Sequence, residues 1–324
     1  MMHKKLCVAV MLALCAMVGH AQLKNGQTTA TYDKGTTNAV FNVTANPDIP
    51  TQVTFAGEKI SLDRLDMAER YDRELTSIIY GQTSTLLCMK RANRHFPVLA
   101  PILKAQGVPS DFLYLACTES TMDFLAYSSA KAAGLWQLLA GTAQQYGLEV
   151  TDEVDERYDP ELSTVAACKY LKAAYSRYGS WTTVAASYNA GMGKISSELT
   201  KQGVERSFDL YLVQETSRYV FRIMAYKTLM ENPKRYGYRL RAEQLYQPVN
   251  YTKVEVTGAV ASWVDWAKAH GITYAQLREA NPWIRSTKLT NSKGRTYQVK
   301  VPLAADLYRS KRQSRTYDKN WVVN

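Results

Sequence analysis

One short stretch limits the fold of this chain more than any other. Residues 111–118 are apolar on nearly every side. A helix of that kind has no face suited to water, so other elements are expected to bury it. Phe112, Leu115 and Ala116 precede Glu119 by seven, four and three positions, so the four side chains share one helical face. The sequence therefore predicts a buried helix that carries a carboxylate inward at its end.

Glu119 is the first candidate for a chemical role. A carboxyl group removed from water resists ionisation, so the pKa of Glu119 should rise toward the range that is useful for proton donation. The alternative is a glutamate at a helix end that reaches solvent or pairs with a basic residue. Its position alone does not decide between the two.

The N-terminus has the pattern of a secretory signal. Two lysines precede an apolar run at residues 6–18, and a Gly-His-Ala sequence follows as a small-residue cleavage site. The run is shorter than the roughly 20 residues that span a bilayer. Cys15 suggests a lipoprotein as the alternative, which the bulky Leu14 before it disfavours. We expect residues 1–21 to be a signal peptide cleaved near Ala21, and the protein to be exported to the periplasm or cell envelope.

The charge of the chain favours an anionic partner. The formal net charge is +11, and loss of the two signal lysines leaves +9. A cell-wall polymer, a lipid headgroup or a nucleic acid would each match that balance. Export disfavours nucleic acid, so we expect no nucleic-acid partner. Peripheral contact with the membrane or with envelope proteins stays open.

Cysteine and histidine are scarce after the signal. Cys88, Cys117 and Cys168 are an odd, scattered set that does not form a disulfide framework, although one pair remains an option. His95 and His270 lie far apart and lack metal-ligand spacing. Neither a zinc site nor a serine or cysteine triad is therefore expected. We expect no metal and no cofactor, and a chemistry based on carboxylates.

The chain divides by pattern into successive parts. Residues 22–59 are rich in Thr, Asn, Ala and Gly and predict a flexible N-terminal segment. Residues 60–247 have helical periodicity and no convincing strand. Residues 248–303 follow the order β-α-α-β, which is typical of a small independent module. The basic residues of 304–324 predict a disordered tail. The expected fold class is mainly α, with a helical domain followed by a small α+β module.

Local signals place some of the helices. The Asp159-Pro-Glu161 sequence is a strong helix start, because Asp caps the first turn and Pro suits its first position. Residues 135–146 predict another helix, with Gly147 as its stop. Pro97 and Pro101 are expected to punctuate the chain after a helical region that ends near His95.

Five motifs stand in order along the helical part. They are Glu119-Ser120, Ala133-Gly-Leu-Trp-Gln137, Asp155-Glu-Arg-Tyr-Asp-Pro160, Ser187-Tyr-Asn-Ala-Gly191 and Glu215-Thr-Ser-Arg-Tyr-Val220. Each motif alone is weak. Together, in this order, they resemble the catalytic domain of the lytic transglycosylases, the soluble-type family related to goose-type lysozyme. The resemblance covers residues 97–240 and implies a lysozyme-like helical fold.

The resemblance implies cleavage of the bond between N-acetylmuramic acid and N-acetylglucosamine in peptidoglycan glycan strands. Glu119 matches the catalytic acid, which protonates the leaving oxygen. As a base it then takes the proton of the muramoyl hydroxyl that attacks its own anomeric carbon, so an anhydro end forms without water. A hydrolytic muramidase and a non-catalytic peptidoglycan-binding protein are the alternatives.

The same resemblance assigns supporting roles around the substrate. Tyr219 matches a tyrosine that orients the catalytic glutamate, and Gln137 a contact to an acetamido or hydroxyl group. Gly134 permits close backbone packing or the close approach of a sugar. Ser120 is equally typical of a helix cap, and Asn189 of a helix stop. The expected substrate-binding set is Ser120, Gly134, Gln137, Tyr188, Asn189 and Tyr219.

A second catalytic carboxylate is not expected. Most glycosidases use two. Asp123 is the nearest candidate here, and the group of Asp155, Glu156 and Asp159 is another. We interpret Asp123 as a cap of the turn after the helix and Asp159 as a helix cap. The family mechanism needs only one carboxylate, with help from the acetamido group of the substrate.

The C-terminal module has a resemblance of its own. Residues 272–282 are similar to the second helix and Asn-Pro corner of a LysM module, and residues 297–302 fit its closing strand. The resemblance implies binding to N-acetylglucosamine polymers. A purely structural cap is the alternative.

Overall fold

The computed structural model describes residues 48–309 and 313–323, so the predicted signal peptide and its cleavage site lie outside the described residues. No helix in the described part is both long and apolar enough to cross a membrane. The helices and strands are, in chain order, β1 (Gln52–Phe55), β2 (Glu58–Ser61), α2 (Leu65–Tyr80), α3 (Gln82–Ala105), α4 (Leu113–Ser120), α5 (Ala140–Gln145), α6 (Pro160–Tyr178), α7 (Trp181–Ala190), α8 (Met192–Gln202), α9 (Gln214–Glu231), β3 (Tyr251–Val256), α10 (Trp263–Ala269), α11 (Tyr274–Ala280) and β4 (Tyr297–Pro302).

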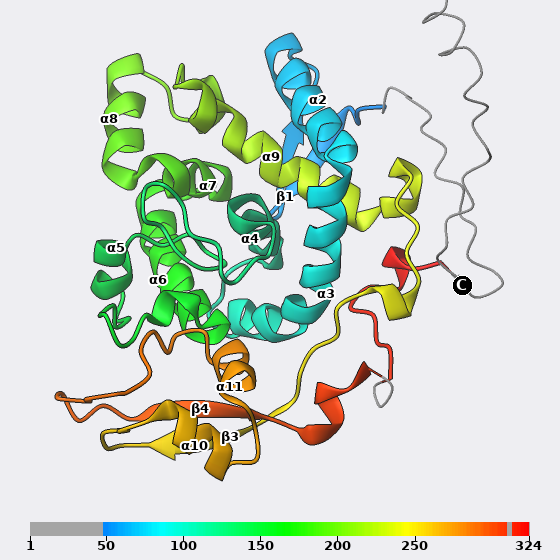
Figure 1. Ribbon diagram of the computed structural model, residues 1–324. Coiled ribbons are helices and arrows are strands. Elements are labelled where there is room, and N and C mark those ends of the chain that lie inside the picture. The colour runs from blue at the N-terminus through cyan, green and yellow to red at the C-terminus, as the bar shows by residue number, and fades with distance from the viewer. Residues whose placement is uncertain (1–47, 310–312, 324) are drawn as a thin grey trace, which may run out of the picture. The chain divides into compact units, whose positions relative to one another are not determined.

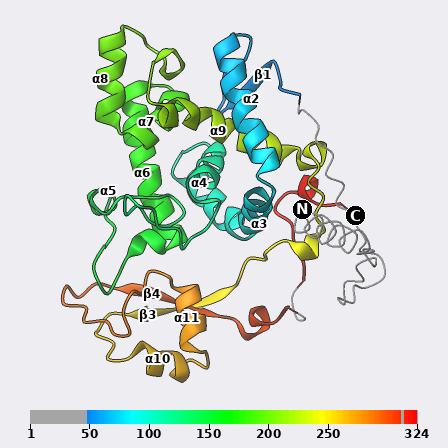
Figure 2. The same ribbon diagram turned by 45° about the horizontal axis from the view of Figure 1, so that its top comes forward.

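Helix α4 lies in the middle of the helical body, with α3 on one side and α9 on another (Figures 1 and 2). Leu115, Ala116 and Cys117 are fully buried there. The buried helix predicted at this place is therefore confirmed. Its first turn is preceded by a single 3₁₀ turn at Ser110–Phe112.

Helix α3 continues through the two prolines that were expected to interrupt it. Pro97 and Pro101 lie inside α3, four residues apart, and both are exposed. A proline leaves the carbonyl four residues earlier without its helical partner. Helix α3 nevertheless runs unbroken from Gln82 to Ala105, with both proline rings at exposed positions.

The helix predicted over residues 135–146 forms only from Ala140 to Gln145. Gly134 and Gln137 before it have φ angles of +78° and +46°, which a right-handed helix excludes. Ala133 and Leu138 instead pair as an isolated antiparallel bridge. We call residues 126–138 the active-site loop, because two of the predicted substrate-binding residues, Gly134 and Gln137, lie on it.

The prediction of a flexible segment up to residue 59, and of no strand before residue 250, is wrong for the described residues. β1 and β2 form an antiparallel hairpin in which Phe55 faces Glu58 across a two-residue turn. Val53, Phe55 and Ile60 are buried. Strands of only four residues give too little alternation to be distinguished from a loop, and their stability comes from packing on the helices.

The basic tail is also ordered where the structure describes it. Trp321 is 1% exposed, and its Nε1 donates a hydrogen bond to the carbonyl of Met230, 2.7 Å away. The ring packs edge-on against Phe96. The sequence pattern emphasised charge, but one buried tryptophan and its hydrogen bond attach residues 313–323 to α3 and α9.

The C-terminal module follows the predicted β-α-α-β order. β3 and β4 pair antiparallel, with Tyr251 opposite Pro302 and Val256 opposite Tyr297. Trp263, Leu277, Ile284 and Val299 are buried in a core of the module's own. The predicted fold class, a mainly helical protein with a small α+β module, is confirmed.

Candidate active site

Glu119 lies in the last turn of α4 and receives a hydrogen bond from Tyr219 on α9. The Tyr219 hydroxyl donates to Oε1 of Glu119. Burial raises the pKa of Glu119 to about 7, and the Tyr219 hydrogen bond opposes that rise. On α9, the charge of Glu215 raises this pKa further and that of Arg222 lowers it. A carboxyl group with this pKa is protonated for much of the time near neutral pH, as a general acid must be.

Helix α4 ends immediately beyond Glu119. Thr121 and Met122 have φ angles of +50° and +57°, so the backbone leaves the helix in the left-handed region. The Thr121 amide donates to the carbonyl of Cys117, 2.9 Å away. This sharp exit fixes Glu119 at the rim of the buried helix, where its side chain is only partly exposed.

Tyr188 connects α7 with the active-site loop. Its hydroxyl donates to the carbonyl of Trp136, 2.7 Å away. Burial, and next the negative charge of Glu119, raise the pKa of Tyr188 well above its usual range. The ring packs edge-on against Tyr170 at 5.2 Å between centroids. Tyr188 is therefore a neutral side chain that holds the loop beside Glu119.

Gln137 lies on the active-site loop and closes it internally. Its Nε2 donates to the carbonyls of Gly134 and Ala126, at 2.9 and 3.2 Å. No hydrogen bond from the described residues reaches its side-chain oxygen. The side chain is half-buried, so that oxygen is suited to accept a hydrogen bond from a ligand.

Gly134 is required by packing. A Cβ at this position would lie 2.0 Å from the carbonyl oxygen of Arg157, and the φ angle is +78°. Of the two roles predicted for this glycine, close backbone packing is the one that the geometry favours.

Ser120 and Asn189 both bond within the protein. Ser120 Oγ is buried and lies 2.9 Å from the carbonyl oxygen of Leu135 and 3.1 Å from that of Ala116. It therefore connects the end of α4 to the active-site loop. Asn189 Oδ1 accepts a hydrogen bond from Thr216 Oγ1 at 2.9 Å, which links α7 to α9.

Two of the acids considered as second carboxylates, Asp123 and Asp159, are engaged elsewhere. Asp123 Oδ2 pairs with Arg91 Nη2 at 2.8 Å, and its Oδ1 accepts from the amide of Leu125 at 3.0 Å. Asp159 Oδ1 accepts from two amides in the first turn of α6. The interpretation of both as caps is confirmed.

Sequence reasoning missed Glu74, which fixes the helix that carries Tyr219. Glu74 on α2 is 1% exposed and pairs with Arg218 and Arg222, the residues on either side of Tyr219 along α9. Arg222 Nε lies 2.8 Å from its Oε2. A glutamate within the buried face formed by Tyr71, Leu75 and Ile78 was a readable signal, of the same kind as Glu119.

Cys88, Cys117 and Cys168 are buried and unbridged, and burial raises the pKa of Cys168 to about 12. A thiol in this state is a poor nucleophile. In residues 48–309 and 313–323, no group of three His, Cys, Asp or Glu side chains is placed to hold a metal ion.

Two family models match this chain. Residues 98–209 match the transglycosylase SLT domain, and residues 252–305 match the soluble lytic transglycosylase C-terminal LysM-like domain. The first match includes Glu119, the active-site loop and α7. The second covers the β-α-α-β module.

Similar proteins include two curated relatives. Membrane-bound lytic murein transglycosylase D of Escherichia coli K12 is 30% identical over 204 residues, which are 61% of this chain and 44% of that protein. The Gly134-Leu-Trp-Gln137 and Lys234-Arg-Tyr-Gly237 motifs predict this resemblance, which is confirmed. A putative tributyltin chloride resistance protein of Alteromonas sp. M-1 is 27% identical over 118 residues, 36% of this chain and 57% of its own length. The chain thus spans less than half the length of the first relative.

Two solved structures are also similar in part. One is the 70 kDa soluble lytic transglycosylase Slt70 of Escherichia coli, at 20% identity and a TM-score of 0.40, over 51% of this chain and 29% of that one. The other is an inactive mutant of the lytic transglycosylase Slt of Pseudomonas aeruginosa, at 22% identity and a TM-score of 0.38, over 51% and 28%. On the evidence of the two family matches, residues 98–209 belong to the transglycosylase SLT family and residues 252–305 to the LysM-like C-terminal family of the soluble lytic transglycosylases.

Proposed function

We propose that this protein is a peptidoglycan lytic transglycosylase in which Glu119 acts alone, first as acid and then as base. The observation that carries the proposal is a carboxyl group with a pKa of about 7, bonded to Tyr219, inside a domain of the SLT family. The substrate is the glycan strand, at the bond between N-acetylmuramic acid and N-acetylglucosamine.

In the first step the protonated Glu119 gives its proton to the glycosidic oxygen as that bond breaks. The acetamido group of the muramic acid stabilises the anomeric carbon as the leaving sugar departs. In the second step the Glu119 carboxylate takes the proton of the primary hydroxyl of the same sugar. That oxygen bonds to the anomeric carbon, so an anhydro ring closes and Glu119 regains its starting proton.

The remaining candidates have positioning and binding roles in this proposal. Tyr219 orients Glu119, and the free acceptor of Gln137 receives a hydrogen bond from an acetamido or hydroxyl group. Tyr188, Ser120 and Gly134 hold the active-site loop through the contacts described above, and Asn189 keeps α7 in place against α9 through its hydrogen bond with Thr216. Because Asp123 and Asp159 are engaged in capping and ion pairs, one carboxylate performs both proton transfers.

The site of action that we propose is the cell envelope, after export directed by residues 1–21. The proposed organisation is a catalytic domain over residues 60–247 and a LysM-like module over residues 248–303. The net charge of +9 after the signal favours an anionic wall polymer.

The Glu119→Gln variant, assayed on isolated sacculi with the masses of the products read, tests the proposal. The wild type should release muropeptides with anhydro ends, and the variant should lose activity by at least about a hundredfold, as expected when a general acid is removed. Products with a reducing end instead would identify a hydrolytic muramidase. The Asp123→Asn variant is the matched control and should retain the anhydro products. Full activity in Glu119→Gln would contradict the assignment.

A further inference from the structure

Residues 149–158 form a connector between the C-terminal module and the active-site loop. On the module side, Val154 is 1% exposed and belongs to the core of the module. It pairs with Ile284 as an antiparallel bridge, and the amide of Asp155 donates to the carbonyl of Trp283 at 2.8 Å. The module is therefore completed by a residue of the helical domain.

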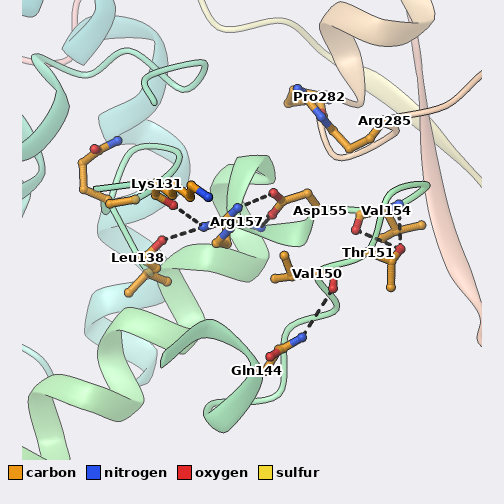
Figure 3. Close-up of polar contacts among 12 residues, drawn as sticks. Lys131, Leu138, Gln144, Val150, Thr151, Val154, Asp155, Arg157, Pro282 and Arg285 are labelled. Carbon is orange, nitrogen blue, oxygen red and sulfur yellow. Dashed lines mark hydrogen bonds and ion pairs between the residues drawn. The ribbon is translucent and has the colours of Figure 1, made fainter. Parts of the chain in front are cut away.

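The other side of the connector reaches the active-site loop through Arg157, which is 5% exposed. Its Nη1 donates to the carbonyl of Lys131 at 2.8 Å and to that of Leu138 at 3.1 Å (Figure 3). These two carbonyls bracket the segment that contains Gly134 and Gln137. One guanidinium nitrogen thus holds both ends of that segment.

Asp155 fixes the direction in which Arg157 points. Arg157 Nε lies 2.9 Å from Oδ1 of Asp155, and Nη2 lies 2.7 Å from Oδ2 (Figure 3). This bidentate pair is buried on both sides and sets the plane of the guanidinium. The Arg157 carbonyl is also the atom against which Gly134 packs.

The contacts are consecutive and short. They run from the Trp283 carbonyl to the Asp155 amide, from the Asp155 carboxylate to the Arg157 guanidinium, and from there to the loop carbonyls. Arg285 adds a second contact across the same boundary, because its guanidinium lies 4.4 Å above the ring of Tyr158. Its amide also donates to the carbonyl of Glu153 at 2.9 Å.

We propose that Arg157 is a positioning residue for the segment 131–138 of the active-site loop, and that the C-terminal module acts on the active site through it. In this view the module is part of the catalytic unit, whether or not it binds sugar. A lysine at position 157 would keep the charge but lose the planar fork, so it would not hold Asp155 and both carbonyls together. The effect on catalysis rests on the proposed function, whereas the effect on the loop does not.

The test compares Arg157→Lys and Arg285→Ala with the wild type by hydrogen exchange and by kinetics. Lys268→Ala, which removes an exposed charge from α10 of the same module, is the matched control. Exchange at the amides of 131–138 should quicken by about tenfold or more in Arg157→Lys and by about threefold in Arg285→Ala, with no change in Lys268→Ala. Because Arg285 is exposed, Arg285→Ala is expected to fold, and it still tests the proposal if Arg157→Lys does not fold.

In the kinetic arm, KM for solubilised glycan strands should rise by about tenfold in Arg157→Lys, with a smaller change in kcat. The pH at which activity falls by half should stay unchanged, since Arg157 does not contact Glu119. Unchanged exchange at 131–138 in Arg157→Lys, or equal behaviour of Arg285→Ala and Lys268→Ala, would overturn the proposal. If exchange responds while Glu119→Gln retains full activity, the coupling stands and the proposed function fails.

Discussion

The hydroxyl of Tyr219 on α9 donates a hydrogen bond to Glu119 on α4, a hundred positions earlier in the chain. The bond stabilises the carboxylate form, whereas burial disfavours it, and burial is the larger effect. The pKa of Glu119 is thus set mainly by burial, and the hydrogen bond from Tyr219 on α9 is the largest effect that opposes it.

Removing that hydrogen bond should move the pH profile upward. In Tyr219→Phe the pKa of Glu119 should rise above about 7, because the stabilised form is the charged one. The alkaline limb of activity should then shift to higher pH, and maximal activity should fall by about tenfold as the carboxyl loses its orientation. Tyr226→Phe, on the same helix, is the control and should leave the limb in place. A limb that moves to lower pH would contradict this account.

Breaking the ion pairs of Glu74 should shift the alkaline limb of the pH–activity profile to lower pH. Glu74→Gln leaves Arg218 and Arg222 without their buried counter-charge. The charge of Arg222 lowers the pKa of Glu119, and an unbalanced arginine lowers it more. We expect the alkaline limb at lower pH and a loss of about 2–3 kcal/mol in the free energy of unfolding. Glu69→Gln, at an exposed position of α2, should change neither quantity.

Glu119 should also make stability depend on pH. Its pKa is 4.5 when unfolded and about 7 when folded, so the folded state binds more protons between these values. The contribution of Glu119 to the free energy of unfolding should therefore be fully present below about pH 4.5. It should be lost, by about 2–3 kcal/mol, as the pH rises through 7. The variant Glu119→Gln lacks this titration. Urea unfolding of both proteins at pH 5 and pH 8 should show that the free energy of unfolding of the variant increases relative to that of the wild type at pH 8 only.

A side chain at position 134 should displace the connector from the active-site loop. Gly134→Ala places a methyl group 2.0 Å from the Arg157 carbonyl and strains a φ angle of +78°. We expect a loss of about 3 kcal/mol or more in the free energy of unfolding. Gly141→Ala, in α5 where nothing lies within 4 Å, is the matched control. It should gain roughly 0.5 kcal/mol, since alanine favours a helix more than glycine. Equal unfolding temperatures for the two variants would refute the packing role.

The N-terminal hairpin should contribute measurably to stability. The Glu58 carboxylate accepts hydrogen bonds from the amides that begin α7 and from Thr182 Oγ1 at 2.8 Å. Glu58→Ala leaves those donors unpaired at the positive end of the helix dipole, so we expect a loss of about 1–2 kcal/mol. Calorimetry should show a lower Tm. Lys59→Ala, at the adjacent exposed position, should not change Tm, and a similar drop there would argue against specific capping.

Several elements could be predicted because their signals are local. The Asp159-Pro160 start of α6 and the apolar segment around Leu115 follow from the identities of nearby residues. The short strands at Gln52–Phe55 and Glu58–Ser61 and the helix limits near Gln137 could not be predicted, because packing partners outweigh weak local preference there. The same holds for Trp321, whose burial overrides the charge pattern of its neighbours.

The sequence by itself determined the helical class, the place of Glu119 on a buried helix and the order of the motifs around it. These depend on periodicity and spacing within one segment. The motif resemblance already assigned Tyr219 to the catalytic glutamate, but only the tertiary structure decided that Glu74 fixes α9 and that Arg157 connects the C-terminal module to the active-site loop. Each of these contacts joins segments whose separation along the chain leaves no local pattern, so they exist only when the helices pack.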